Sequence, residues 1–189
     1  MSAIITWTVV GVLCVYTTIL FNALVSVKNA VTKAWANIDV LLKQRHDELP
    51  KLVDTCKQYM AHEQATLERV IAARSNVARA RESQDMPALG QAEAVLRSGV
   101  GRLLAVAEAY PDLRSNEQFM HLNGRISGLE NAIADRREFY NECVAINNTR
   151  IEQFPELLLV RWFGFKAFEP LQFDVEELKD VDIAQRMRA

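Results

Sequence analysis

The sequence is poor in glycine and proline, with 7 Gly and 5 Pro among 189 residues. It also lacks any sustained alternation of apolar and polar residues, which is the pattern of a half-buried strand. Apolar residues instead recur every three or four positions along most of the chain, which is the spacing of one helix face. We therefore expect an all-α protein.

Cysteine is scarce as well. Cys14, Cys56 and Cys143 are odd in number and show no CxxC or metal-ligand spacing, so a disulfide framework is not expected. They are typical of reduced thiols packed as small apolar residues in a reducing compartment.

Charged side chains are missing from the first 27 residues. Residues 3–25 supply roughly 20 predominantly apolar positions, enough at about 1.5 Å per residue to cross the roughly 30 Å hydrocarbon core of a bilayer. A cleaved signal peptide is the alternative, but it normally begins with a basic region and has an apolar stretch of about 7–15 residues. We predict a transmembrane anchor within residues 1–27.

The flanks of this anchor differ in charge. No Lys or Arg precedes it, whereas Lys28, Lys33, Lys43 and Arg45 follow it. Because such residues tend to stay in the cytoplasm, we expect the N-terminus outside the cell and the bulk of the chain inside. The basic membrane-proximal face is either an ordinary solvated surface or one attracted to anionic lipid headgroups.

Beyond the anchor, the apolar spacing predicts about four long helices, as in a bundle or coiled coil. The first continues the membrane helix and kinks or breaks near residues 46–49, because Pro50 has no amide hydrogen for the carbonyl of residue 46. The second covers residues 49–81 and the third residues 89–110. A capping box at Ser115 and Gln118 starts the fourth, whose apolar stripe reaches Phe154.

Three consecutive polar residues, His46, Asp47 and Glu48, invite comparison with a metal site. Successive side chains on a helix point about 100° apart, so the three cannot converge on one ion. His62-Glu63 begins like the zinc motif HExxH, but Thr66 stands where the second histidine is required. The stretch is interpreted as a helix corner, with no metal.

Other signatures of chemistry are missing too. The GVGRLL stretch at residues 99–104 lacks the glycines and lysine of nucleotide-binding loops, and no GxSxG is present. A formal net charge of −2 argues against a nucleic-acid-binding surface. We expect no enzyme activity, no cofactor and no nucleic acid.

Several short motifs are shared with one protein family. They are Phe21-Asn22, Ala34-Trp35, Ile38-Asp39-Val40, Pro50 to Val53, Tyr59 to Glu63, Tyr110 to Leu113 with Asn116, Arg137 to Asn141, Phe154-Pro155 and Phe163-Gly164-Phe165. Over nearly the whole chain the sequence resembles the LemA family of bacterial membrane proteins. The resemblance implies one N-terminal membrane helix, here in the bacterial inner membrane. It also implies an antiparallel bundle of long helices over residues 28–168 and no established enzymatic activity. The charged segment 169–189, expected to form a short helical tail, departs from the family pattern.

Two sets of residues are singled out as structural sites. Asp39 is costly beside a core face unless paired, and Arg137 is its predicted partner. An apolar segment is expected to contact the bilayer or another copy of the chain, and its aromatic members are Phe154, Trp162, Phe163, Phe165 and Phe168.

Two functions fit these features. The first is a membrane-anchored scaffold that self-associates through its long helices into a homo-oligomer. The alternative is a tethered adaptor that recruits a protease or signalling partner, of unknown identity, through its C-terminal segment.

Overall fold

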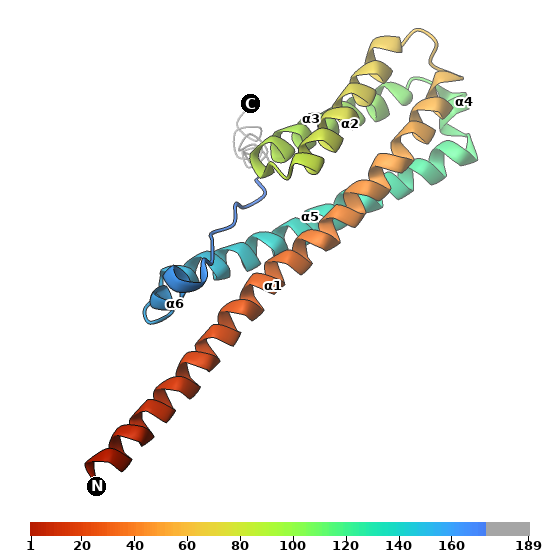
Figure 1. The fold of residues 1–189 in the computed structure, drawn as a ribbon. Helices are drawn as coiled ribbons and strands as arrows, with labels where there is room; N and C mark the ends of the chain where they lie inside the picture. The colour runs from red at the N-terminus through yellow and green to blue at the C-terminus, as the bar shows by residue number, and fades with distance from the viewer. Residues whose placement is uncertain (173–189) are drawn as a thin grey trace, which may run out of the picture. The chain divides into compact units, whose positions relative to one another are not determined.

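The structure is a computed structural model that describes residues 1–172. Over these residues it contains helices and no strand, which confirms the all-α prediction (Figure 1). The helices are α1 (Ser2–Lys57), α2 (Gln64–Ser83), α3 (Met86–Ala107), α4 (Pro111–Arg114), α5 (Glu117–Glu152) and α6 (Glu156–Phe163). Most of the predicted helical tail, residues 173–189, lies outside the described residues. The predicted limits of anchor, bundle and tail stay a prediction.

The chain divides into two compact units, and α1 and α5 contribute to both. The first unit contains residues 1–38 and 134–170, so it holds the start of α1, the end of α5, α6 and the segment after α6. No residue before Leu24 is buried. Within the described part, α1 is the one helix long and apolar enough to cross a membrane, and none of its most apolar window is buried.

From Leu24 onward α1 has a buried stripe. In the first unit this stripe continues through Val31, Ala34 and Ile38, each at most 1% exposed. Residues of α5 are buried as well, at Tyr140, Val144 and Ile151. The rings of Trp35 and Tyr140 lie 6.0 Å apart between centroids. Large apolar side chains at steps of three and four thus pair the two helices.

The second unit contains residues 39–133 together with Leu171 and the residues after it. In it α2 and α3 form an antiparallel hairpin (Figure 1). Gln84 takes the left-handed conformation at the end of α2, with φ of 54°. The side chain of Asp85 then accepts a hydrogen bond of 2.9 Å from the amide of Ala88, which caps α3. Pro87 lies in the first turn of α3, where a missing amide hydrogen is tolerated.

Leu171 fixes the end of the described chain to this unit. Its side chain is fully buried, and a Cβ at Gly90 of α3 would collide with the carbonyl oxygen of Gln172. Glycine at position 90 is therefore required by the close approach of this segment to α3.

Two predicted helix boundaries are wrong. The first helix does not break at residues 46–49: α1 continues through Pro50 to Lys57, and the break falls at residues 58–63 instead. The fourth helix is not capped by Ser115, because the side chain of Asn116 accepts from the amide of Phe119 at 3.0 Å and α5 begins at Glu117. Phe154, predicted to extend the stripe of this helix, lies beyond it and is 79% exposed.

Candidate functional site

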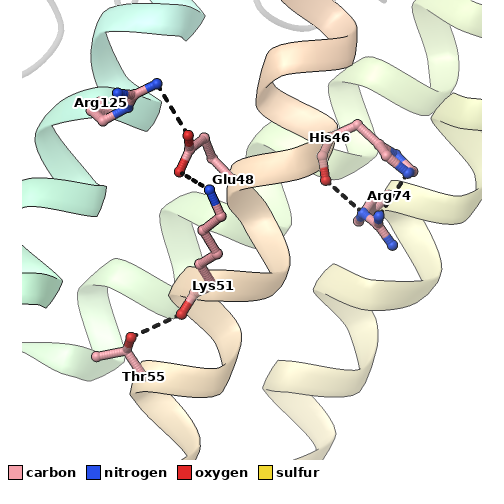
Figure 2. A network of polar contacts seen from close by, with 6 residues as sticks. All are labelled: His46, Glu48, Lys51, Thr55, Arg74 and Arg125. Carbon is pink, nitrogen blue, oxygen red and sulfur yellow. Dashed lines mark hydrogen bonds and ion pairs between the residues drawn. The ribbon is translucent and has the colours of Figure 1, made fainter.

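The stretch His46–Asp47–Glu48 lies on α1 in the second unit, and its side chains have separate surroundings (Figure 2). Asp47 is exposed. Glu48 accepts from Lys51 at 3.3 Å and lies 3.1 Å from Arg125 of α5. Within residues 1–172, no group of three or more His, Cys, Asp or Glu side chains is placed to hold a metal ion. The stretch makes polar contacts between helices.

Arg74 of α2 explains why α1 passes through Pro50. The proline has no amide hydrogen to give to the carbonyl of His46, four residues earlier. The Nε of Arg74 donates to that carbonyl oxygen at 2.8 Å, and its Nη2 lies 2.6 Å from Nε2 of His46 (Figure 2). Because guanidinium only donates, the imidazole nitrogen accepts. Burial, followed by the charge of Arg74, lowers the pKa of His46. The carbonyl left by Pro50 is thus satisfied from a second helix.

A buried ion pair crosses the interior of the second unit. Arg45 of α1 and Glu93 of α3 are each 3% exposed, and Nη2 of Arg45 donates to Oε2 of Glu93. Both residues occupy buried-stripe positions: Arg45 lies four residues before Leu49, and Glu93 three before Leu96. Such a pair offsets its own desolvation only when both partners are present.

Glu130 of α5 interacts electrostatically with both members of this pair. Burial raises the pKa of Glu130, against the opposing effect of Arg45 and Arg97. Four buried atoms have no hydrogen-bond partner among the described groups, and they are Arg45 Nε, Glu93 Oε1, Asn123 Oδ1 and Glu130 Oε1. A buried charge cluster with spare hydrogen-bonding capacity is typical of either a reaction centre or a helix-register device. It contains no nucleophile, and the register role fits its stripe positions.

Asp39 and Arg137 are the two members of the predicted polar pair. Asp39 is half-exposed and lies 3.6 Å from Nε of Arg81 of α2. Arg137 is half-buried on α5 and makes interactions of its own. The Asp39–Arg137 pair therefore stays a prediction.

The five aromatic residues of the apolar segment have different positions in the first unit. Phe163 and Phe165 pack on Phe21 of α1, with ring centroids 4.8 and 6.0 Å away. Phe154 and Trp162 are 79% and 88% exposed. The aromatic residues of two separate predicted motifs, Phe21-Asn22 and Phe163-Gly164-Phe165, thus form one cluster.

Residues 165–170, which we call the strap, run back along α5 after α6. Asn148 holds the backbone of Phe168 twice: its Oδ1 accepts from the amide at 3.0 Å and its Nδ2 donates to the carbonyl at 2.9 Å. Asn147, only 2% exposed, donates to the carbonyl of Lys166 at 3.2 Å. The hydroxyl of Tyr140 donates to the carbonyl of Glu169 at 2.9 Å. Polar residues within the α5 stripe therefore fasten a non-helical segment.

A last pair of motif residues meets in the second unit. Asn116, at the start of α5, donates to the hydroxyl of Tyr59 in the loop after α1 at 3.1 Å. The contact ties the α1–α2 loop to the α4–α5 corner. It is a structural contact between two corners of the unit.

Taken with the fold, these features define a class: a membrane-associated helical protein whose polar residues mainly fasten helices and backbone to each other. The chain belongs to the LemA family, whose sequence profile matches residues 34–184. The expected departure of segment 169–189 from the family pattern is not confirmed, because the match continues to residue 184.

Similar curated proteins include magnetosome proteins. MamQ 1 and MamQ 2 of Paramagnetospirillum magneticum are each 36% identical over 75 residues, which is 40% of this chain and 28% of theirs. MamQ of Magnetospirillum gryphiswaldense is 33% identical over 72 residues, covering 38% of this chain and 26% of its own. The chain thus matches little more than a quarter of the length of these relatives.

Proposed function

We propose that this LemA protein is a membrane-anchored, non-enzymatic scaffold that self-associates at the bacterial inner membrane. The observation that carries the proposal is the continuity of α1. One helix runs from the exposed apolar N-terminal residues into the stripe that begins to be buried at Leu24. The anchor and the bundle therefore share a helix with no linker between them, as suits a structural element whose position on the membrane matters.

Self-association requires an uncovered face outside the anchor. Phe139 and Ile146 lie two helical turns apart on one face of α5 and are 49% and 47% exposed. Large apolar residues seven apart, on either side of the buried Cys143, suit contact with a helix of another copy. Confinement to the membrane raises the effective concentration of copies, so a small contact suffices.

Size measurement tests this proposal. We expect the full chain in mild detergent to form a discrete homo-oligomer by light scattering, and the double variant Phe139→Ser/Ile146→Ser to form a smaller particle with unchanged helicity. Val95→Ser is the matched control, because Val95 is 59% exposed in the second unit. A monomeric wild-type chain would overturn the scaffold. If that monomer also retained a single partner through residues 173–189, the adaptor function would take its place.

The orientation is tested separately. A reporter enzyme fused after Ala189 is expected to be active only in the cytoplasm, since Lys28 and Lys33 follow the anchor. Activity only in the exported location would reverse the topology and leave the scaffold proposal intact.

A further inference from the structure

The first unit exposes a second apolar surface, separate from the Phe139–Ile146 face. It is formed by α6 and the turn before it, where Phe154, Leu158 and Trp162 are 79%, 57% and 88% exposed. Leu157 and Phe163 add to it at 41% and 59%. Water is a poor environment for so large a patch on an eight-residue helix.

The depth of α6 relative to the anchor follows from one contact. Phe163 packs on Phe21, at 4.8 Å between ring centroids. Phe21 lies inside the predicted span of residues 3–25, four residues before its end, which is about 6 Å along the helix axis. A side chain that touches Phe21 is therefore at the depth where hydrocarbon meets headgroups.

The surface between α6 and α1 is also apolar. A groove of about 500 Å³ lies between Phe163 and the α1 side chains that include Leu13, Thr17 and Phe21. It joins the patch on α6 to the uncovered apolar surface of α1, so the two form one continuous apolar surface. Exposed Arg161 and Lys166 border the patch, where cationic side chains extend to headgroups.

Polar contacts with α5 and the strap fix the position of α6 on the face opposite its apolar patch. Glu156, in its first turn, is buried and pairs with Arg150 of α5 at 3.2 Å. The strap fixes the far end through Asn147 and Asn148. The helix is thus held at both ends with its apolar residues outward.

From this placement we propose that α6 is an interfacial helix. Together with the turn before it, α6 inserts Phe154, Leu158 and Trp162 into the leaflet where the anchor ends. The occupant of the patch is lipid and not a second copy of the chain. The inference rests on the membrane anchor of the proposed function, and it is independent of self-association. Tryptophan at an interface is favourable because its ring is apolar and its N–H reaches the headgroups.

The three tryptophans of the chain provide the test. Trp7, Trp35 and Trp162 are the full set. Variants of the full chain that keep one of them, with phenylalanine at the other two positions, are reconstituted in phosphatidylcholine–phosphatidylglycerol vesicles. The lipids carry bromine either near the headgroup end or near the tail end of the acyl chain, and quenching of fluorescence reports depth.

We expect Trp162 to be quenched several-fold more by shallow than by deep bromine. Trp7 is the positive control for the anchor. Trp35 is the negative control, because it lies about 15 Å beyond residue 25 along α1 and packs on Tyr140. A Leu158→Trp chain with phenylalanine at the three natural positions gives a second probe of the same surface, and shallow quenching is expected there too.

Other outcomes would overturn the inference. If neither brominated lipid nor aqueous iodide quenches the fluorescence of Trp162 or of the Leu158→Trp variant, protein covers the patch and a second copy is the occupant. Quenching by iodide and by neither lipid would show that α6 is exposed to water and not inserted in the leaflet. An unquenched Trp7 would remove the anchor itself, and with it the basis of both proposals, whereas a monomeric chain with lipid-quenched Trp162 would remove only the scaffold.

Discussion

In the second unit the buried stripe of α1 is interrupted by Arg45, whereas in the first unit the buried stripe of α5 is interrupted by Asn147. Arg45 forms an ion pair with Glu93 on a neighbouring helix. Asn147 donates a hydrogen bond to a backbone carbonyl of the strap. One interruption joins helix to helix, and the other joins a helix to a segment without regular structure.

The difference follows from what each neighbour offers. A packed helix has already used its backbone hydrogen bonds, so only a side chain is free to pair with a buried polar group. A strap has unpaired amides and carbonyls that require partners, and neutral amides satisfy them with little desolvation cost. Loss of one buried polar side chain should therefore lower the free energy of unfolding more in the second unit. In the first unit the same kind of change should loosen the strap locally, with a smaller effect on the free energy of unfolding.

The largest effect is expected from Glu93→Ala. It leaves the charge of Arg45 buried without its partner, which costs about 3–5 kcal/mol in the free energy of unfolding. Denaturant unfolding of the full chain in nonionic detergent measures the loss. The double variant Arg45→Met/Glu93→Leu should recover wild-type stability or exceed it, because apolar replacement of both partners is often neutral or stabilising.

An exposed ion pair provides the control. Lys57 and Asp54 are 53% and 70% exposed and 3.3 Å apart, so Asp54→Ala should change stability by about 0.5 kcal/mol or less. If Glu93→Ala costs no more than this control, the Arg45–Glu93 pair does not hold the unit together.

Much of this arrangement is visible in the sequence. The stripe positions Leu122, Ile126 and Ile133 of α5 are buried as the spacing predicts. Arg45 and Glu93 also occupy stripe positions on α1 and α3. Two opposite charges on the apolar faces of two helices indicate a buried ion pair, and the sequence interpretation did not use this signal. Which two stripes face each other depends on packing that a single sequence does not specify.

Other features lie beyond local pattern. Pro50 predicts a break because proline removes a hydrogen bond from its own helix, yet the compensating donor, Arg74, is 24 residues later in a separate helix. The double hydrogen bond from Asn148 to Phe168 spans 20 residues in the same way. Asn148 is visible in the sequence as a polar residue, but its partner is not, since the partner is backbone and carries no sequence signal.

A second prediction addresses the strap. Asn148→Ala removes both hydrogen bonds to Phe168 and should cost about 1–3 kcal/mol locally. Hydrogen exchange should show faster exchange at residues 166–169, while the exchange of α2 and α3 in the second unit stays unchanged. Asn148→Asp retains the acceptor for the Phe168 amide and should lose less protection there. Uniform acceleration across both units would mean that the strap is part of the global core.

A third prediction concerns Pro50 and tests whether Arg74 replaces the missing hydrogen bond. Arg74→Met should destabilise the chain by about 1–2 kcal/mol, because the carbonyl of His46 loses its donor. In a Pro50→Ala background the restored amide serves that carbonyl, so the same change should cost less. A double-mutant cycle on the free energy of unfolding should give a coupling of about 1 kcal/mol. Additive effects would show that the carbonyl does not depend on Arg74.

The smallest expected effect is the pH dependence caused by His46. Burial and Arg74 lower its pKa in the folded chain below the ordinary 6.5, so the unfolded chain binds the proton more readily. Stability should then be complete above about pH 6.5 and fall as the pH drops from there toward the folded pKa, below which this contribution levels off. His46→Gln keeps a neutral acceptor for Arg74 at every pH, and it should flatten this part of the profile of melting temperature against pH. His121→Gln is the control, because His121 is exposed on α5. If the two variants follow the wild-type profile equally, protonation of His46 does not affect the contact with Arg74, and the imidazole is only a spectator of the bond between Arg74 and the carbonyl.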